Sequence, residues 1–407
     1  HRSKDLDNWI KMIKPIFEEN IGSSIKFCIL AEGKMDLYPR NKPTMEWDIA
    51  AGHSILKAAG GNIFSESGMQ IQYGKTNFKN KNFLAVGKIT QRLPSFFLMG
   101  LNQLNQVKYK QDLNLAIKAI KDKKLVVFPT ETVYGIGAIG NSEIAINAIY
   151  SAKQRPYNNP LIAHTYNKHE AEKIVVFTKI AHLLTDQFWP GPLTIILQIK
   201  KNNLSNILSQ GSKTLAVRVP SHPVALDLLE KVNTPILAPS ANKSGGVSPT
   251  SANHAREDFG PHYKGKSWVL EKILDYGVCE VGIESTVVDC RGKSPIILRH
   301  GAITETMISN ATNTKALTLN KTEELISPGL LKSHYAPNAK VLLNQKNIIT
   351  DSGWLTFGKI PKSLQKQENM FNLSLDGNLI QAGELLYSGL RFLDASGVKV
   401  IQVMTIP

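Results

Sequence analysis

The sequence predicts an α/β fold made of more than one compact unit. Its 407 residues exceed the length of one typical domain, so we expect two or three units, each with its own core. Between residues 112 and 309, short apolar runs alternate with runs of helical spacing, which is typical of a sheet covered by helices. A shorter strand, helix, strand pattern occupies residues 338–407, and residues 1–95 form a third region.

The spacing of apolar residues predicts the helices and strands of residues 1–95 and 112–309. In residues 1–95, IKFCILAEG predicts a strand and DIAAGHSILKAAGG an apolar helix. In residues 112–309, DLNLAIKAIKD and SEIAINAIYSAK predict helices, the second with Ser142 as its N-cap. KLVVFPT and PLIAHT predict strands, and the alternation continues through LTIILQI, TLAVRVP, PVALDLLEKV and IESTVVDC.

The periodicity fades over residues 310–337, which are rich in Thr, Asn and Lys and contain SPG, so this stretch is interpreted as a linker. After it, AKVLLN, GWLTFGK and VKVIQVM surround one strongly amphipathic helix. One face of that helix carries Leu379, Ala382, Leu386, Leu390 and Leu393.

Composition favours anionic partners and a reducing compartment. A formal charge of +15 and a pI near 9.5 suit nucleotides, pyrophosphate or RNA. The three cysteines, Cys28, Cys279 and Cys290, show no CxxC spacing, so neither a zinc site nor a disulfide framework is expected. No signal peptide is recognised, and no apolar run approaches the roughly 20 residues that span a bilayer. We therefore expect a cytoplasmic protein with no membrane partner.

The stretch SAKQRPYNNPLIAH gathers three potential cations, Lys153, Arg155 and His164. Cations at a helix C-terminus are favoured by the helix dipole, by about 0.3 to 1 kcal/mol, which would explain two of them without any ligand. Pro156 and Pro160, however, stiffen the segment. Such stiffening suits a guanidinium held for planar, bidentate recognition of phosphate or carboxylate.

Five further motifs carry polar residues at strands or strand ends. PTETVYGIG, residues 129–137, is expected to link a strand to a helix, either as a ligand loop or as a simple turn. LAVRVP places Arg218 in an apolar strand, where a charge must be paired or must face a cavity. APSAN followed by Ser248, IESTVVD with Ser285, and LRHG with Arg299 add hydroxyls and another arginine. A turn, a paired core residue or an N-cap explains each alone, but together they favour a polar, cationic cavity.

Such a cavity suits a nucleoside triphosphate together with a small zwitterion. Arginine and lysine would neutralise phosphate, hydroxyls would orient ribose or amino acid, and Mg²⁺ is expected on the phosphates of ATP. The sequence contains no GxxxxGK[ST] and no GxGxxG, which argues against an ordinary P-loop or Rossmann nucleotide site.

In this order, PTETVYGIG, AKQRPYNNPLIAH, FWPGPLT, LAVRVP, APSAN, ESTVVD and LRHGAIT resemble the threonylcarbamoyl-AMP synthase family in its two-domain form. The resemblance covers residues 112–407 and implies a YrdC-like α/β domain with a twisted mixed sheet. SPGLLKSHYAP resembles the interdomain linker, and residues 338–407 resemble a small, truncated C-terminal α/β, Rossmann-like domain. The implied activity makes L-threonylcarbamoyladenylate from L-threonine, bicarbonate and ATP, and releases pyrophosphate.

The resemblance also implies roles for individual residues. Lys153 and Arg155 would act catalytically on the phosphates. The residues implied for L-threonine are Thr132, His164, Arg218, Ala238 and Ser285. Those implied for ATP are Arg155, Asn159, Thr214, Ser240, Ser248, Arg299, His334 and Tyr335.

The implied product serves N6-threonylcarbamoyladenosine formation in tRNA, which makes a tRNA threonylcarbamoyltransferase complex the downstream partner. Two alternatives stay open. One is an RNA-binding module, with weak RNA binding suggested by the +15 charge. The other is a decayed fusion product without activity.

KFCILAEGKMDLYPR and PTMEWDIAAGHSILKAAGG resemble the C-terminal half of 3'(2'),5'-bisphosphate nucleotidases of the inositol monophosphatase family. The resemblance makes Asp48 a vestigial metal ligand. GxxDxxxxxE and DPxDG are absent, and one carboxylate cannot build a two-metal site, so no phosphatase activity is expected. Apolar surface from Ile49 to Leu56 is expected to lie uncovered, because half of the layered core would be missing.

Overall fold

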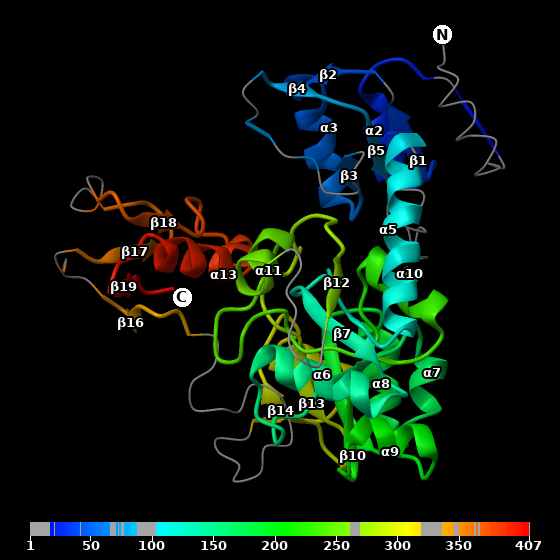
Figure 1. Ribbon diagram of the computed structural model, residues 1–407. Helices are drawn as coiled ribbons and strands as arrows, with labels where there is room; N and C mark the ends of the chain where they lie inside the picture. The colour runs from blue at the N-terminus through cyan, green and yellow to red at the C-terminus, as the bar shows by residue number, and fades with distance from the viewer. Residues whose placement is uncertain are drawn as a thin grey trace. The chain divides into compact units, whose positions relative to one another are not determined.

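The computed structural model describes residues 17–87 and 103–406, with gaps at 20, 41, 66–70, 72, 75–76, 261–268, 319–335, 346–348, 350, 362–363 and 365–366. The side chains of residues 103–108 are also outside the description. The chain divides into two compact units, His1–Asn114 and Leu115–Pro407. Figure 1 shows the elements of both units.

The N-terminal unit contains a small antiparallel sheet and two helices. Its strands are β1 (Leu37–Arg40), β2 (Thr44–Met45), β3 (Asn62–Ser65), β4 (Lys79–Asn80) and β5 (Phe83–Val86), and its helices are α2 (Ile25–Ala31) and α3 (Glu46–Ala58). β5 pairs antiparallel with β1 and β3, and β2 pairs with β4. The partial α/β fold expected for this region is therefore present.

Two expectations for the N-terminal unit were wrong. IKFCIL forms the helix α2 rather than a strand, because its buried residues Phe27 and Leu30 are three apart and so lie on one helix face. Ile49 and Leu56 on α3 are buried rather than uncovered, and of the apolar surface expected there Ile55 is exposed (48%). They pack with α2 and with β-strand residues such as Ile63 in a small core of their own.

A ten-stranded mixed sheet dominates the second unit. Its strands are β6 (Leu125–Phe128), β7 (Gly135–Ile139), β8 (Ile162–His164), β9 (Leu193–Gln198), β10 (Thr214–Arg218), β11 (Ile236–Leu237), β12 (Leu270–Ile273), β13 (Thr286–Asp289), β14 (Ile296–Arg299) and β15 (Leu317–Thr318). Their order is β12-β6-β7-β11-β8-β10-β9-β13-β14-β15. The mixed sheet expected from the sequence is confirmed.

α5 (Gln103–Lys121) crosses the boundary between the two units, and its residues from Leu115 onward belong to the second. The other helices that accompany this sheet are α6 (Glu143–Lys153), α7 (Lys168–Glu172), α8 (Lys179–Phe188), α9 (Asn203–Ser209), α10 (Pro223–Val232), α11 (Ala252–Phe259) and α12 (Glu305–Thr312). Ser142 caps α6 as expected, because its side chain accepts a hydrogen bond from the backbone N–H of Ala145. α12 crosses the expected linker boundary at residue 310, and β15 continues the sheet beyond it.

PTETV does not link a strand to a helix. It connects β6 to β7, which pair antiparallel with Phe128 opposite Gly135 and Val126 opposite Gly137. Glycine at 137 permits close packing here, because a Cβ atom would lie 2.7 Å from side-chain atoms of both Ile236 and Phe128. The segment is therefore a tight connection between two buried strands.

The C-terminal part of the second unit is a four-stranded parallel sheet with one long helix. The strands are β16 (Lys340–Leu342), β17 (Gly353–Thr356), β18 (Met370–Asn372) and β19 (Val400–Val403), in the order β16-β19-β17-β18, and the helix is α13 (Leu379–Ala395). Ala382, Leu390 and Leu393 are buried as expected, but Leu379 is 54% exposed. Tyr387 contributes to the buried face of α13 instead.

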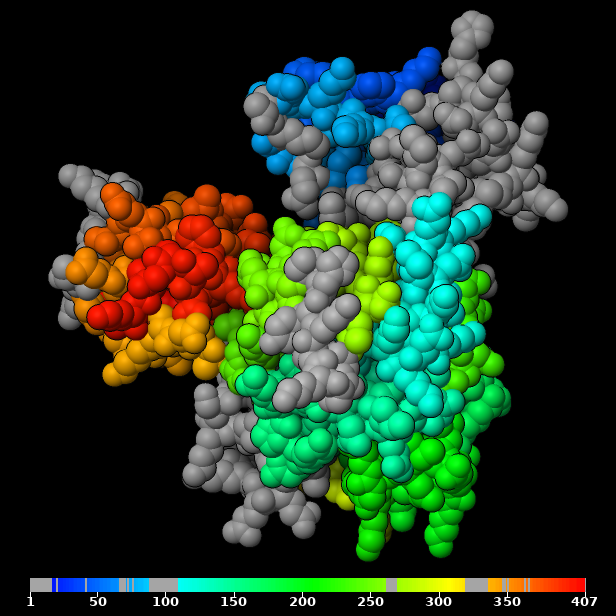
Figure 2. Space-filling view, viewed as in Figure 1, coloured from blue at the N-terminus to red at the C-terminus, as the bar shows by residue number. Residues whose placement is uncertain are grey.

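α13 contacts the larger part of its own unit directly. Arg391 donates hydrogen bonds to the carbonyl oxygen of Val247 (2.6 Å) and to the carboxylate of Asp258 (2.5 Å). Figure 2 shows the surfaces of α13 and α11 side by side. In addition, a Cβ atom on Gly282 would lie 2.4 Å from the backbone of Glu384, which indicates very close packing.

No helix in the described part of the chain is both long enough and apolar enough to cross a membrane.

Candidate functional site

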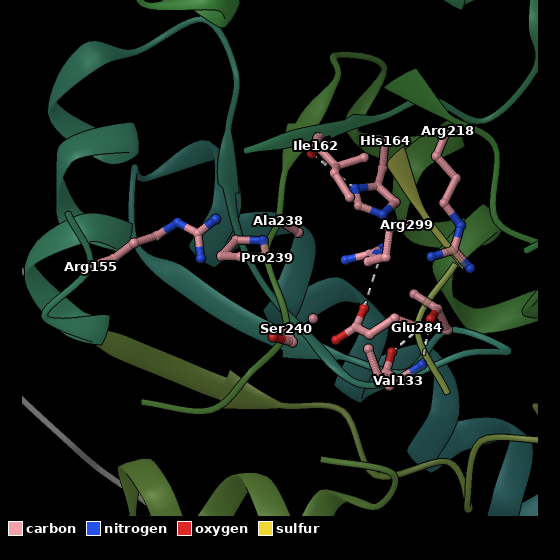
Figure 3. A pocket seen from close by; sticks show the side chains of 12 residues that line it. Val133, Arg155, Ile162, His164, Arg218, Ala238, Pro239, Ser240, Glu284 and Arg299 are labelled. Atoms are coloured by element: carbon pink, nitrogen blue, oxygen red, sulfur yellow. Dashed lines mark hydrogen bonds and ion pairs between the residues drawn. The ribbon is translucent and has the colours of Figure 1, made fainter. Parts of the chain in front are cut away.

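A pocket of about 450 Å³, including its open mouth, lies where several strands of the ten-stranded sheet end (Figure 3). His164 and Arg218 are the last residues of the parallel strands β8 and β10, and the register places them side by side. Arg299 ends β14. The lining residues are Thr130, Val133, Gly135, Arg155, Ile162, His164, Arg218, Ala238, Pro239, Ser240, Glu284 and Arg299. Carboxyl ends of parallel strands are the usual place for ligands in α/β sheets.

Arg155 is held by the loop that follows it. Its Nε donates to the carbonyl oxygen of Asn159 (3.0 Å), and its Nη2 donates to the side-chain oxygen of Asn159 (2.6 Å) and to the carbonyl oxygen of Pro160 (2.9 Å). Arg155 is only 6% exposed as a residue, and it lines the pocket. The stiff proline-containing segment therefore fixes this arginine, as the sequence suggested. Among the residues that the structure describes, the buried Nδ2 of Asn159 has no hydrogen-bond partner.

Lys153 does not line the pocket. The side chain is almost completely buried, and its ammonium donates to the carbonyl oxygens of Ser240 and Asn242. Burial, with the nearby Arg155 charge, holds the pKa of Lys153 well below its usual range. The structure thus places the Lys153 ammonium against the backbone of the 239–242 loop, where it supports a wall of the pocket.

His164 lies on the pocket wall as a neutral imidazole. Burial, together with the neighbouring charge of Arg218, lowers the pKa of His164 from 6.5 to about 3. Its Nδ1 donates to the carbonyl oxygen of Ile162 (3.1 Å). The ring is therefore uncharged at neutral pH.

Arg218 is paired with a carboxylate and also lines the cavity, so both environments that the sequence allowed for it are present. Its Nη2 lies 2.6 Å from a carboxylate oxygen of Glu131, and its Nε donates to the carbonyl oxygen of Gly191 (3.3 Å). Both side chains of the ion pair are about 95% buried. The second carboxylate oxygen of Glu131 accepts the backbone N–H of Ser221 (3.0 Å).

Arg299 belongs to a second polar network. It donates from Nε to the carbonyl oxygen of Ser285 (3.0 Å) and from Nη2 to the hydroxyl of Ser285 (2.9 Å). Glu284 lies 3.7 Å from Arg299 Nη2 and accepts a hydrogen bond from the hydroxyl of Ser248 (2.6 Å). In Figure 3 the dashed contact between Arg299 and Glu284 crosses the region below His164.

The structure brings most of the predicted site residues together. Arg155, His164, Arg218, Ala238, Ser240 and Arg299 line the pocket, and Asn159, Ser248 and Ser285 are hydrogen-bonded to residues that line it. His334 and Tyr335 lie outside the described residues.

Two further predicted residues lie elsewhere. Thr132 is fully buried and hydrogen-bonds to Thr130, which lines the pocket in its place. Thr214 begins β10, at the opposite end from Arg218, and lines a separate pocket of about 640 Å³ with Lys213 and Arg291.

Sequence reasoning missed Thr130, Glu131 and Glu284. Each lies within a motif that was singled out, PTET or IEST. An acidic residue beside apolar strand residues carries the same signal that identified Arg218, because a buried carboxylate also needs a partner.

Asp48 takes a structural position in the N-terminal unit. Its carboxylate accepts the backbone N–H of Met45 (2.8 Å), the N-cap residue of α3, and so satisfies one free donor at the start of that helix. Among the described residues, no group of three or more His, Cys, Asp or Glu side chains could hold a metal ion. Nothing in the described residues therefore joins Asp48 to other ligands.

Three family profiles match successive parts of the chain. The Sua5, YciO and YrdC profile, described as "Telomere recombination", matches residues 118–301. The profile of the threonylcarbamoyl-AMP synthase C-terminal domain matches residues 303–407, and that of the inositol monophosphatase family matches residues 6–93.

Named relatives agree with these profiles. Threonylcarbamoyl-AMP synthase of Pyrococcus abyssi is 40% identical over 304 residues, which cover 71% of this chain and 87% of the relative. The Bacillus subtilis enzyme of the same name is 40% identical over 233 residues, or 56% of this chain and 65% of the relative. The crystal structure of P. abyssi Sua5 complexed with L-threonine superimposes with a TM-score of 0.65 at 32% identity, covering 72% of this chain and 89% of that one. The chain therefore belongs to the threonylcarbamoyl-AMP synthase family.

Proposed function

We propose that the pocket makes L-threonylcarbamoyladenylate from L-threonine, bicarbonate and ATP, with release of pyrophosphate. The observation that carries this proposal is the convergence of three guanidinium groups, Arg155, Arg218 and Arg299, with the neutral His164 on one pocket. A triphosphate and an amino-acid carboxylate are both anionic, so separate arginines suit a site that must hold the two together.

Arg155 and Arg299 are proposed to bind the phosphates of ATP. The guanidinium of each is anchored by carbonyl or hydroxyl oxygens, so its orientation is set before a ligand arrives. Preorganised cations of this kind stabilise charge that develops on a leaving group.

Mg²⁺ would enter with ATP as part of the substrate. Glu284 is the one carboxylate that lines the pocket in the described part of the chain, and it already accepts a hydrogen bond from Ser248. One carboxylate does not provide enough ligands for a magnesium site formed by the protein alone. It suits an ion that is held mainly by phosphate oxygens and water.

Arg218 is proposed to bind the carboxylate of L-threonine, with His164 beside it. P. abyssi Sua5, the relative described above, was crystallised with L-threonine. A neutral His164 can exchange hydrogen bonds with the amino acid without adding a positive charge next to its ammonium group.

The chemistry then depends on positioning. The threonine amine attacks the carbon of CO₂ derived from bicarbonate, forms a C–N bond and loses a proton to give a carbamate. A carbamate oxygen attacks the α-phosphorus of ATP, and the bond from that phosphorus to the bridging oxygen of the β-phosphate breaks. Pyrophosphate leaves with the electron pair. Holding the reactants together supplies much of the rate enhancement, and no covalent enzyme intermediate is needed.

The product is proposed to supply a threonylcarbamoyl group to tRNA adenosine through a tRNA threonylcarbamoyltransferase complex, in the cytoplasm. Weak RNA binding at the basic surface is compatible with this role, given the net charge of +15.

Pyrophosphate release tests the proposed function. It should require both ATP and L-threonine and should persist when salt is raised from 50 to about 200 mM, because the substrates are held in a buried site. A module that binds only RNA phosphates would instead lose affinity steeply over that range. Pyrophosphate release that is independent of threonine would contradict the proposal.

A further inference from the structure

Two glutamates contact arginines of the pocket: Glu131 pairs with Arg218, and Glu284 lies near Arg299. We propose that Glu131 and Glu284 are positioning residues: Glu131 orients Arg218 toward threonine, and Glu284 orders Ser248 and Arg299 toward the nucleotide. The inference rests on the proposed function, because it uses the assignment of each arginine to one substrate.

Glu131 acts on Arg218 from outside the pocket. It does not line the cavity, and its side chain is only 5% exposed. One carboxylate oxygen pairs with Arg218 Nη2 at 2.6 Å, and the other accepts the backbone N–H of Ser221 at 3.0 Å. The Nε of Arg218 also donates to the carbonyl oxygen of Gly191. Together these contacts hold one edge of the guanidinium and restrict its orientation.

A purely structural ion pair is the competing explanation for Glu131. Buried pairs are weak contributors to stability, since apolar replacements of similar volume are often as stable. The arginine of this pair, however, is itself a pocket residue at the end of β10. Loss of the carboxylate therefore changes where Arg218 points, whatever it does to stability.

Glu284 has a different geometry. It lines the pocket, accepts the hydroxyl of Ser248 at 2.6 Å and lies 3.7 Å from Arg299 Nη2. A carboxylate in an anion pocket repels phosphate, so its presence calls for a compensating role. Direct binding of Mg²⁺ fits poorly, because the metal would stand next to the Arg299 guanidinium. Ordering of Ser248 and partial neutralisation of Arg299 fit the observed contacts.

The proposal predicts that replacing Glu131 raises mainly the KM for L-threonine, whereas replacing Glu284 raises mainly the KM for ATP. Glu131→Gln should raise the KM for L-threonine at least about tenfold and the KM for ATP by less than about threefold. Glu284→Gln should show the reverse, with the smaller effect, because its contact with Arg299 is longer. Rates of pyrophosphate release over a matrix of threonine and ATP concentrations give both KM values for each variant.

Double variants separate positioning from general damage. If Glu131 acts through Arg218, the double variant Glu131→Gln with Arg218→Met should have the same threonine KM as Arg218→Met alone. If the two residues act independently, the factors by which each substitution raises the KM should multiply. The double variant also removes both charges together, which avoids a buried unpaired arginine. Should Glu131→Gln alone fail to fold, Glu131→Asp keeps the charge and withdraws it by one carbon, and it should still raise the threonine KM selectively.

The outcomes are distinct. Equal changes in both KM values, or multiplicative effects in the double variants, would overturn the positioning roles while leaving the proposed function intact. Arg218→Met and Arg299→Met serve as references: if neither discriminates between threonine and ATP, the substrate assignments themselves are wrong. A wild-type protein that releases no pyrophosphate would overturn the proposed function and the inference with it.

Discussion

Burial gives His164 a measurable effect on stability. Its pKa is about 3 in the folded protein and 6.5 as an ordinary value, so between these values the unfolded chain binds a proton that the folded chain does not. Stability therefore falls as pH decreases below 6.5, by roughly 1.4 kcal/mol per pH unit, and His164 adds no pH dependence above 6.5.

Urea denaturation of the wild type and of His164→Gln at pH 8, 7, 6 and 5 checks this. The difference between the two free energies of unfolding should be constant above pH 6.5. Below pH 6.5 the free energy of unfolding of the wild type should fall relative to that of His164→Gln. Because both proteins share all other histidines, parallel curves throughout would contradict a buried neutral His164.

Arg155 should be needed for catalysis more than for folding. Arg155→Ala should lower the rate of pyrophosphate release by roughly a hundredfold or more, because a preorganised cation at the leaving group is lost. Arg155→Lys should recover little of it, since one ammonium cannot reproduce the three hydrogen bonds to the Asn159–Pro160 segment.

The matched control is Arg256→Ala, which removes a partly exposed arginine paired with Asp275 on the protein surface. Its rate should equal that of the wild type. A well-folded Arg155→Ala protein, as judged by circular dichroism, with near-wild-type synthesis would refute the role of Arg155.

Individual residues show what the sequence could and could not predict. Arg218 was predictable because a charge in an apolar strand has few acceptable environments. The family resemblance placed Lys153 with Arg155 at the phosphates. In the structure, Gln154 between them adopts a left-handed C-cap conformation (φ 52°), and the two side chains have different hydrogen-bond partners. Spacing in sequence does not predict direction across a helix end.

At the scale of elements, the docking of α13 depends on one glycine. Gly282 has φ +69° and lies so close to Glu384 that a Cβ atom would approach its backbone to 2.4 Å. Gly282→Ala should therefore displace α13 and destabilise the protein by more than the roughly 1 kcal/mol that a positive φ alone costs a non-glycine residue.

Gly211→Ala is the control, because Gly211 also has a positive φ (+85°) but a Cβ atom there would meet nothing within 4 Å. Thermal unfolding and limited proteolysis of α13 should distinguish the two variants. Equal destabilisation by both would show that the close contact with Glu384 contributes nothing.

Helices and strands could be predicted where the apolar periodicity extends over many residues. The prediction failed where the periodic stretch is short. The helices α6 and α13 and the strands β6 and β8 were predicted from their apolar spacing. IKFCIL was not, since six apolar-rich residues satisfy either period and tertiary packing of Phe27 and Leu30 settles the outcome. Likewise, the small residues of GIGAI gave no strand signal, although close packing against Phe128 and Ile236 makes them a strand.

At the scale of the whole molecule, the N-terminal unit is expected to fold without contributing to synthesis. It has its own apolar core, and Asp48 caps α3 rather than joining other acidic side chains in the described residues. A chain that begins at Met99 should therefore keep the wild-type rate of pyrophosphate release.

The same comparison tests for phosphatase activity. The full chain should release no phosphate from 3'-phosphoadenosine 5'-phosphate with or without Mg²⁺. Asp48→Asn should cost less than about 1 kcal/mol of stability, because the amide oxygen of Asn can still accept the backbone N–H of Met45. Magnesium-dependent phosphate release that Asp48→Asn abolishes would show that the N-terminal unit is catalytic.

The central claim is that one pocket joins threonine, bicarbonate and ATP in a single adenylate. The most direct measurement incubates the full chain with ATP, L-threonine and ¹³C-bicarbonate and identifies the product by mass spectrometry. The account predicts a threonylcarbamoyl-AMP that carries one ¹³C atom, formed in equal amount to pyrophosphate and nearly absent with Arg155→Ala. An adenylate without the label, or pyrophosphate without an adenylate, would contradict it.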